Sequence, residues 1–246
     1  MGGKIKVVQH ERGAKASSDS ILLASVVTAR EIGKNGRVLD VGTGSGAVAM
    51  AMLWRLPSAF ITGVDAHDEM AELARLSAEE NGFEGRFEAR LEDITKQSAE
   101  FRRLEFDAVV TNPPYHSGAM SSDELRAAAR SKSVSVDEWI RGCVARLCTG
   151  GVFAIINKVE NMAEIVTSMV RLKMGKIEIF PIASKTGEAA KRVIIRGIKG
   201  SRAPAKLHPY IVMHEPIGGF SPAAIMILEE GRDIMAVIEA LAEEGL

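Results

Sequence analysis

The stretch Asp40-Val-Gly-Thr-Gly-Ser-Gly46 carries most of the information about the fold of this chain. It lies between the apolar run Arg37–Val41, typical of a buried strand, and a helical segment. Glycines at positions 42, 44 and 46 permit a tight turn and let a ligand approach the backbone closely. The free N–H groups and the positive dipole end of the following helix suit a carboxylate. The G-x-G-x-G spacing differs from the pyrophosphate-binding G-x-G-x-x-G, which argues against an NAD site and leaves a bare tight turn as an alternative.

Short apolar strands alternate with amphipathic helices around this turn. The predicted buried strands cover residues 37–41, 60–65, 86–90, 106–111 and 152–157. One helix pattern starts with Asp68 as N-cap and stops at Asn81-Gly82, and another starts at the capping box Ser135-x-x-Glu138. This alternation predicts a parallel sheet with right-handed crossovers.

The pattern changes after residue 175. Residues 176–182 and 191–198 resemble strands, and the connection between them is short and polar, so we expect an antiparallel hairpin at one edge of the sheet. Residues 17–33 resemble a helix ahead of the first strand. We therefore expect one α/β, Rossmann-like domain over residues 1–246, with a helical and basic N-terminal extension at 1–36 and an acidic helical tail at 232–246.

The composition limits the classes of function. The 246 residues carry a net charge of −1, so binding of nucleic acid would need a local basic patch. Cys143 and Cys148 are expected on one helix, and they suit a reducing compartment rather than a disulfide. The five histidines lack metal-ligand spacing, so we expect no metal. Because the N-terminus lacks the apolar core of a signal peptide and no apolar run is long enough to span a bilayer, we expect a soluble cytoplasmic protein.

Two acids follow the next strands at the same predicted sheet edge. Asp65 ends the second strand and can accept hydrogen bonds from both hydroxyls of an adenosine ribose. Asp93 follows the third strand and can accept from the exocyclic amine of adenine, although a loop-capping role is an alternative. Ala66 and Ile94 offer apolar faces to the adenine ring. Ligands of open α/β sheets bind at the carboxyl ends of the strands, which is where these residues are expected.

The segment Thr111-Asn112-Pro113-Pro114-Tyr115 follows the fourth strand and opens onto the same edge. Its two prolines hold the chain extended and remove two N–H donors. An amide or adenine amino nitrogen is a poor nucleophile because its lone pair is delocalised. The Asn112 side-chain oxygen and the Pro113 carbonyl can accept its two N–H hydrogens, and Tyr115 can stack on the planar group, a contact worth about 1–3 kcal/mol for a base. The motif therefore predicts chemistry on a planar nitrogen, achieved mainly by placement.

The ordered set of motifs resembles the class I methyltransferases that use S-adenosylmethionine (SAM). The resemblance implies SAM as cofactor and a seven-stranded, mostly parallel sheet with one antiparallel edge strand and helices on both faces. The cofactor-binding residues that it implies are Asp40, Gly42, Gly44 and Gly46 at the methionine part, Asp65 at the ribose, Asp93 at the adenine, and Ala66, Ile94 and Asn112 beside them. The Asn-Pro-Pro-Tyr signature is similar to that of N-methyltransferases acting on adenine N6 or on glutamine amides.

Within this class, the chain resembles the bacterial tRNA1(Val) adenine-N6 methyltransferase family over about residues 8–231. The matching segments are 12–23, the glycine motif, the Asn-Pro-Pro-Tyr motif, the pair Ala129-Arg130, and residues 190–200, 207–211 and 220–222. Ser131 departs from the family, which has His or a similar polar residue there. Glutamine methyltransferases of the release-factor type and DNA adenine methyltransferases carry extra domains for which this chain has no room.

The resemblance implies N6-methylation of the adenine beside the anticodon, position 37, of a valine tRNA. It places Asn112, Pro113, Pro114 and Tyr115 at the reacting nitrogen, and it implies RNA contacts by Tyr115, Arg130, Lys191 and Arg192. Two alternatives are methylation of another RNA base and methylation of a protein glutamine amide. A third, from a different class, is a catalytically silent module that binds SAM and RNA, against which the intact motif at 112–115 argues.

The distribution of charge agrees with an RNA partner. Residues 171–206 contain Arg171, Lys173, Lys176, Lys185, Lys191, Arg192, Arg196, Lys199, Arg202 and Lys206, against two glutamates. The N-terminal stretch adds further lysines and an arginine. Such a cluster can follow the phosphates of a nucleic acid, although a solvated basic face is an alternative.

Overall fold

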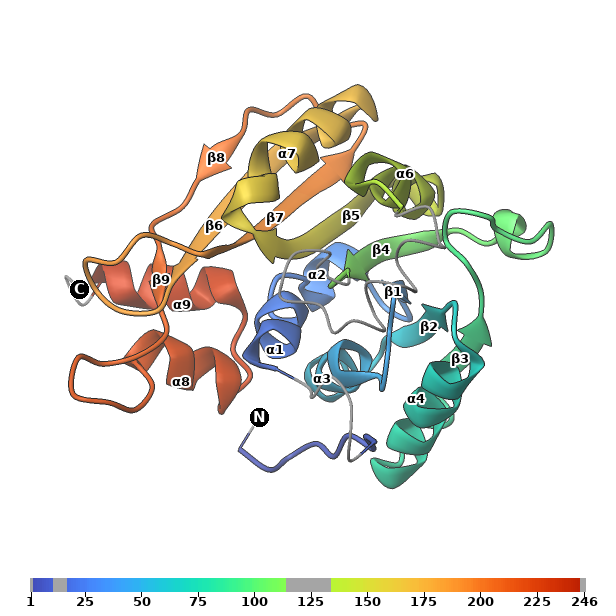
Figure 1. Cartoon of the computed structure of the whole chain (residues 1–246), viewed down its shortest axis with the longest axis horizontal. Helices are drawn as coiled ribbons and strands as arrows, with labels where there is room; N and C mark the ends of the chain where they lie inside the picture. The colour runs from blue at the N-terminus through green and yellow to red at the C-terminus, as the bar shows by residue number, and fades with distance from the viewer. Residues whose placement is uncertain (1, 11–16, 114–133, 244–246) are drawn as a thin grey trace, which may run out of the picture.

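The structure is a computed structural model, and it describes residues 2–10, 17–113 and 134–243 (Figure 1). Within these residues, a nine-stranded sheet has the order β3-β2-β1-β4-β5-β7-β6-β8, and β9 pairs with β6. The strands are β1 (Arg37–Val41), β2 (Phe60–Asp65), β3 (Phe87–Leu91), β4 (Phe106–Thr111), β5 (Leu147–Lys158), β6 (Met174–Ala183), β7 (Arg192–Lys199), β8 (Lys206–Leu207) and β9 (Ile211–Val212). The helices are α1 (Ser18–Ala24), α2 (Ala29–Ile32), α3 (Ala47–Arg55), α4 (Asp68–Glu80), α6 (Val136–Ala145), α7 (Met162–Arg171), α8 (Pro222–Leu228) and α9 (Ile234–Glu243), with 3₁₀ turns at Phe101–Arg103 and Val159–Asn161.

The first five strands are parallel, so their carboxyl ends meet at one edge of the sheet, called the carboxyl edge below. Val41 of β1 pairs with Val64 of β2 on one side and with Thr111 of β4 on the other. Asp65 pairs with Leu91 of β3. The residues that follow these strands are therefore brought to the same level at the carboxyl edge, although they are far apart in the sequence.

The antiparallel hairpin predicted after residue 175 is confirmed, but its antiparallel strand does not lie at the edge. β7 runs antiparallel to both β5 and β6 and lies between them. The outer side of β6 is then covered by the short parallel strands β8 and β9. These two short strands pair with residues 178–179 and 182–183 of β6, and they cover part of an edge that would otherwise expose unpaired backbone groups. Among the described residues the sheet therefore has nine strands rather than the seven expected.

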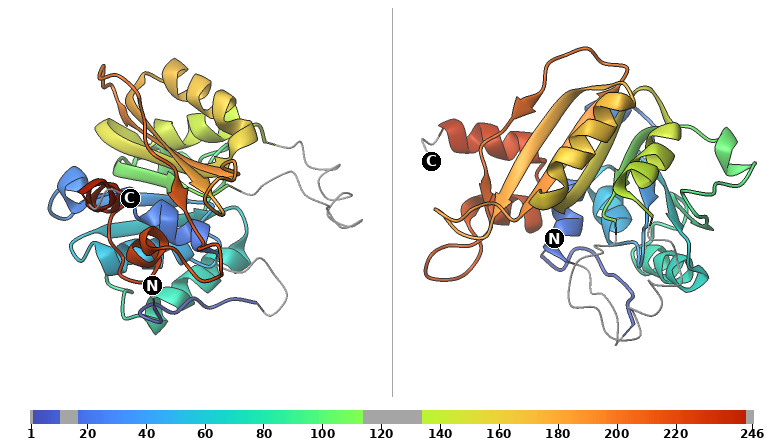
Figure 2. Two further views of the ribbon diagram at one scale, coloured as in Figure 1. Left: turned by 90° about the vertical axis from the view of Figure 1, so that its left-hand side faces the viewer. Right: turned by 45° about the horizontal axis from the view of Figure 1, so that its top comes forward.

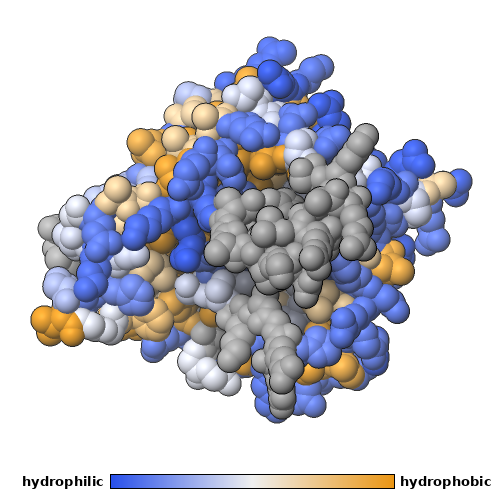
Figure 3. Space-filling view, in the orientation of Figure 1, coloured by the Kyte–Doolittle hydropathy of each residue, from blue (hydrophilic) through white to orange (hydrophobic). Residues whose placement is uncertain are grey.

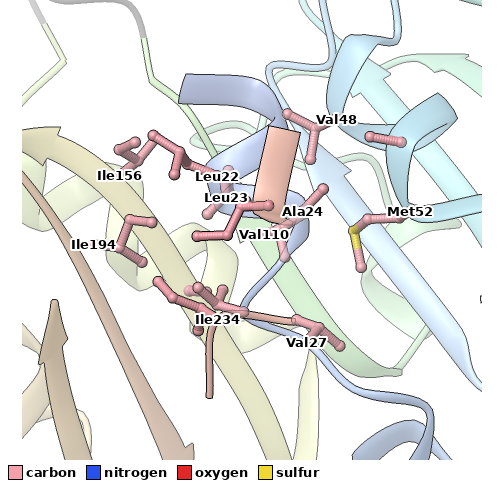
Figure 4. Packing of buried hydrophobic residues seen from close by; sticks show 14 of the residues in the cluster. Leu22, Leu23, Ala24, Val27, Val48, Met52, Val110, Ile156, Ile194 and Ile234 are labelled. Carbon is pink, nitrogen blue, oxygen red and sulfur yellow. The ribbon is translucent and has the colours of Figure 1, made fainter. Parts of the chain in front are cut away.

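Helices cover both faces of the sheet, as predicted, and each face has its own apolar core (Figure 2). α1, α3, α8 and α9 pack on one face, and α6 and α7 pack on the other. Neighbouring strand residues alternate between the two cores: Val109 and Ile195 belong to the second, whereas Val110 and Ile194 belong to the first. Figure 4 shows the first core, where Val110, Ile156 and Ile194 of the sheet lie close to the apolar side chains of α1. This two-sided burial explains why the strands are apolar along their whole length.

Most helix boundaries follow the local signals. The Ser135–Glu138 capping box starts α6, with the Ser135 hydroxyl accepting from the Glu138 N–H at 3.2 Å. α4 ends at Glu80 before Asn81-Gly82, but its N-cap is His67 rather than Asp68, which is the first helical residue. Its first-turn acids still lie where the helix dipole favours negative charge.

Three further expectations need correction. Residues 17–33 form two helices, α1 and α2, rather than one, because the chain turns at residues 25–28. Cys143 lies on α6, whereas Cys148 lies on β5, so the two cysteines are not on one helix. Residues Ile234–Glu243 of the expected extra tail form α9, and Ile234 and Val237 are fully buried in the first core, which makes α9 part of the packed fold.

No helix among the described residues is both long enough and apolar enough to cross a membrane.

Hydrophilic side chains predominate at the top of the face in Figure 3, over the C-terminal end of α7. Arg171 and Lys173 are exposed there, at the amino end of β6. That end is opposite to the carboxyl edge.

Candidate active site

The glycine turn after β1 is shaped by three left-handed glycines. Gly42, Gly44 and Gly46 have φ values of +69°, +53° and +84°. The Gly42 N–H donates to the Val64 carbonyl of β2 at 2.9 Å, which holds the turn against the neighbouring strand. A Cβ on Gly46 would lie 3.3 Å from Ala74 of α4, whereas a Cβ on Gly44 would meet no described atom within 4 Å. Among the described residues, the turn is therefore packed on the side of Gly46 and open on the side of Gly44.

Asp40 lies beneath this turn with its carboxylate almost wholly buried. Its Oδ2 accepts a hydrogen bond from the Thr43 hydroxyl at 2.7 Å. Its Oδ1 has no hydrogen-bond partner among the described residues. Burial raises the pKa of Asp40 from its ordinary value of 3.8 to about 7, and the nearby charge of Asp65 adds to the rise, against the hydrogen bond from Thr43. The site thus holds a carboxyl group poised to ionise near neutral pH.

Asp65 lies at the end of β2, facing the turn. Its Oδ2 accepts from the Gly44 N–H at 3.1 Å, and its Oδ1 accepts from the His67 N–H at 3.0 Å. The side chain is 12% exposed, so it is largely enclosed by the turn and the start of α4. Ala66, the next residue, is exposed at the same edge.

Asp93 follows β3 at the same edge and caps its own turn. Its Oδ1 accepts from the backbone N–H and the hydroxyl of Thr95 at 2.9 and 2.7 Å, and its Oδ2 lies 3.5 Å from the Lys96 ammonium. Partial burial raises the pKa of Asp93, but the hydrogen bonds from Thr95 and the charge of Lys96 lower it further, so the net direction is downward. Ile94 is 3% exposed and packs in the second core, so little of its side chain faces solvent.

Asn112 and Pro113 follow β4 and are half-buried. Because Thr111 pairs with Val41, Asn112 emerges at the level of Gly42, next to the glycine turn. Pro114, Tyr115 and Arg130 lie outside the described residues. The part of the motif that the structure describes is therefore brought directly beside the predicted cofactor turn.

The sequence analysis missed Trp139 and Thr111 at this junction. The Trp139 Nε1–H donates to the Thr111 hydroxyl at 2.9 Å, and that hydroxyl donates to the Val41 carbonyl at 2.8 Å. A Cβ on Gly42 would lie 3.3 Å from the Trp139 ring. Helical spacing on α6 indicates only that Trp139 lies near the core, because periodicity does not identify which strand end it meets.

The predicted substrate residues Lys191 and Arg192 are exposed at the carboxyl edge, at the start of β7. The Arg192 Nε lies 2.9 Å from the Asp19 Oδ2 of α1, and Arg192 remains 47% exposed whereas Asp19 is 5% exposed. In the backbone register of the sheet, Arg192 lies opposite Lys158 at the end of β5, the strand beside β4. Asp19 is thus a further residue of this edge whose role the spacing of charges did not reveal.

The basic residues of 171–206 do not form one patch. Arg196 is 4% exposed and pairs with Glu178 and Glu31, and the Lys199 ammonium donates to the carbonyls of Val144 and Leu147 at 3.0 and 2.6 Å. The exposed cations of the cluster lie mainly at the two ends of the hairpin. Toward the amino end of β6 lie Arg171, Lys173, Lys176 and Arg202, and Lys206 lies opposite the middle of β6. At the carboxyl edge lie Lys185, Lys191 and Arg192. The prediction of a single basic cluster is therefore wrong, and only the group of Lys185, Lys191 and Arg192 adjoins the site.

Comparison with known proteins identifies the family. The family model of the methyltransferase small domain matches residues 13–178, more than half of the chain. The tRNA1(Val) (adenine(37)-N6)-methyltransferase of Phocaeicola vulgatus is 31% identical over 194 residues, which cover 76% of this chain and 79% of that protein. The protein of the same name from Yersinia enterocolitica is 32% identical over 153 residues, 61% of this chain and 59% of its own length.

A solved structure is similar to this chain over most of its length. The crystal structure of a predicted O-methyltransferase from Agrobacterium tumefaciens is 31% identical to this chain, with a TM-score of 0.70, and the match covers 87% of this chain and 96% of that one. The sheet order and the antiparallel β7 are those of class I SAM-dependent methyltransferases.

The residues at the carboxyl edge fit SAM. The buried Asp40 carboxyl group has an oxygen without a partner among the described residues, and Gly44 leaves the outer side of the turn open. Asp65 lies across the turn, where a ribose hydroxyl can bind. The chain belongs to the methyltransferase small domain family of SAM-dependent methyltransferases, together with the tRNA1(Val) (adenine(37)-N6)-methyltransferases that it resembles.

Proposed function

We propose that this protein transfers the methyl group of SAM to the N6 atom of adenine 37, beside the anticodon of a valine tRNA. The observation that carries the proposal is the position of Asn112-Pro113 at the end of β4, level with Gly42 of the cofactor turn. Hydrogen-bond acceptors for a planar amino group therefore adjoin the residues that fit SAM. The names of the relatives from Phocaeicola and Yersinia support adenine 37 as the acceptor.

The chain's own residues act mainly by orienting the acceptor. SAM, when bound, supplies a methyl group on a positively charged sulfur. The Asn112 side-chain oxygen and the Pro113 carbonyl accept the two N–H hydrogens of the amino group, which orients the nitrogen toward the methyl group and stabilises the positive charge growing on it. Tyr115 stacks on the base. The methylated nitrogen loses its extra proton readily, so placement in line with the methyl group is the main requirement.

The charges at the carboxyl edge suit an RNA strand around the target base. Lys185, Lys191 and Arg192 are exposed there, and Arg192 is oriented by the buried Asp19. Each can contact a phosphate, so RNA binding should weaken as salt rises. The target adenine must be splayed out of its loop to reach Asn112, which is the usual mode for enzymes that modify a base.

The test is methyl transfer to total tRNA from a strain that lacks the activity. The purified protein is incubated with labelled SAM, and the nucleosides are then separated. We expect N6-methyladenosine, located at position 37 of a valine tRNA by fragment analysis. Label in another nucleoside or in a protein glutamine would show that the acceptor is a different group. The absence of N6-methyladenosine would refute the proposal.

Asn112→Ala tests the role of the motif. We expect the variant to bind SAM as the parent does and to transfer methyl groups about 10²-fold or more slowly, as when one oriented polar partner is removed from other active sites. Asn161→Ala is the matched control, because Asn161 lies beyond the end of the neighbouring β5 and outside the motif. Equal transfer rates for Asn112→Ala and the parent would contradict the mechanism.

A further inference from the structure

We propose that Trp139 is a positioning residue that holds the cofactor turn and the acceptor motif in register. The inference rests on the proposed function, in which Asn112-Pro113 orients the acceptor beside SAM. Trp139 comes from α6, on a different element from either motif, and it meets both of them at the carboxyl edge.

The contacts form a continuous link across three elements. The indole N–H of Trp139 donates to Thr111 at 2.9 Å, and Thr111 is the residue directly before Asn112. The Thr111 hydroxyl in turn donates to the Val41 carbonyl at 2.8 Å, directly before Gly42. The edge of the indole ring lies where a Cβ of Gly42 would be 3.3 Å away. One side chain thus fixes the residue before the acceptor motif and the first glycine of the cofactor turn.

The arrangement limits how far the two motifs can move apart. Thr111 is fully buried, so its hydroxyl has no water with which to replace the indole N–H. α6 itself is held at its start by the reciprocal capping box of Ser135 and Glu138. The indole ring therefore projects from a helix whose start is stabilised by hydrogen bonds, and a shift of Trp139 would change the distance between Gly42 and Asn112. Small misplacements of this kind are costly to methyl transfer, because the reaction depends on alignment.

A tryptophan that merely fills the core would also need a partner for its N–H. The two roles predict different kinetics for variants that lose this hydrogen bond but keep an apolar side chain at the substituted position. Trp139→Phe and Thr111→Val remove the link from either side, and Thr111→Ser keeps the hydroxyl. For a positioning role we expect the first two to lower kcat roughly five- to tenfold, with a smaller change in the KM for SAM.

The loss of kcat in the double variant Trp139→Phe/Thr111→Val should be smaller than the product of the two single losses, because both substitutions remove the same Trp139–Thr111 hydrogen bond. Thr111→Ser should retain most of the parent's kcat. The melting temperature of each variant is measured alongside. An unchanged kcat in a folded Trp139→Phe protein, or multiplicative losses in the double variant, would overturn the inference.

A second readout does not depend on the acceptor. The chain has two tryptophans, Trp54 and Trp139, and Trp54 lies on α3 with its ring 4.8 Å from the Lys4 ammonium. In Trp54→Phe, emission comes from Trp139 alone, and titration with S-adenosylhomocysteine should change it saturably. In Trp139→Phe, the emission of Trp54 should stay constant while calorimetry still detects binding.

The two readouts separate the possible failures. If the parent protein does not methylate adenine, the proposed function fails, but the fluorescence titration still tests the contact between Trp139 and the cofactor turn. If the parent methylates adenine and S-adenosylhomocysteine binds without altering the emission of Trp139, the coupling inference fails and the proposed function stands.

Discussion

Replacing Asp40 by asparagine should make the stability of the ligand-free protein less dependent on pH. Asparagine has nearly the same shape, and its amide oxygen can still accept from the Thr43 hydroxyl, which now bonds to Asp40 at 2.7 Å. Unlike aspartate, asparagine has no side-chain proton that titrates. Burial holds the pKa of Asp40 at about 7, so the folded protein keeps this carboxyl group protonated over a pH range in which the unfolded chain has lost the proton.

The size of the effect can be worked out from that pKa. Between its ordinary value of 3.8 and the folded value of about 7, the folded state binds more protons than the unfolded state, so the free energy of unfolding falls as the pH rises. One pKa unit is equivalent to about 1.4 kcal/mol. The stabilisation that the protonated group contributes at low pH is thus lost through this window, and the loss is complete above the folded pKa.

The assay is urea unfolding of both proteins, free of ligand, from pH 5 to pH 8. The variant should gain stability relative to the parent by about 2–3 kcal/mol across this range and then stay level. Asp93→Asn is the matched control, because the pKa of Asp93 is lowered and its titration falls below this range. A difference between the Asp40→Asn protein and the parent that stays constant from pH 5 to pH 8 would refute the reasoning.

Three other changes have predictable effects. Gly46→Ala should lower the stability by roughly 1–2 kcal/mol and weaken SAM binding, measured by thermal melting and calorimetry, because φ is +84° and the new Cβ meets Ala74 at 3.3 Å. Arg196→Met should cost about 3–5 kcal/mol in urea unfolding, since it removes the guanidinium that pairs with the buried Glu178 and leaves that carboxylate with His208 alone; a change below 1 kcal/mol would contradict a structural role. Arg192→Ala should reduce the slope of log Kd for tRNA against log salt by about 0.7–0.9, measured on protein shown to be folded by thermal melting because Asp19 loses its ion pair. An unchanged slope would exclude Arg192 from the RNA contacts.

Local signals in the sequence were sufficient for much of the fold. The strands 37–41, 60–65 and 106–111 match β1, β2 and β4 to the residue, because apolar runs of five or six residues are long enough for a buried strand but too short for a typical helix. The glycine turn and the Ser135–Glu138 cap also depend only on neighbours a few residues away. Since parallel strands place their carboxyl ends together, the order of motifs along the chain already predicted that Asp40, Asp65 and Asn112 would meet.

Charge was less predictable, because its meaning depends on what packs against it. Arg192 and Arg196 look alike in the sequence, yet one is half exposed and the other is buried against Glu178 and Glu31. The hairpin also separates the two ends of a basic stretch that is compact in the sequence, because β7 from residue 192 to 199 extends over about 23 Å at about 3.3 Å per residue. Nearness along the chain therefore did not translate into one surface.

The sequence by itself determined the α/β class, the cofactor turn and the acceptor motif, since each depends on residue types at short spacing. Only the tertiary structure decided that β7 lies inside the sheet, that Asp40 is buried deeply enough to titrate near neutral pH, and that Trp139 meets Thr111 and Gly42. These features depend on contacts between residues far apart in the chain. Such contacts are set by how whole helices and strands pack, and no local pattern specifies them.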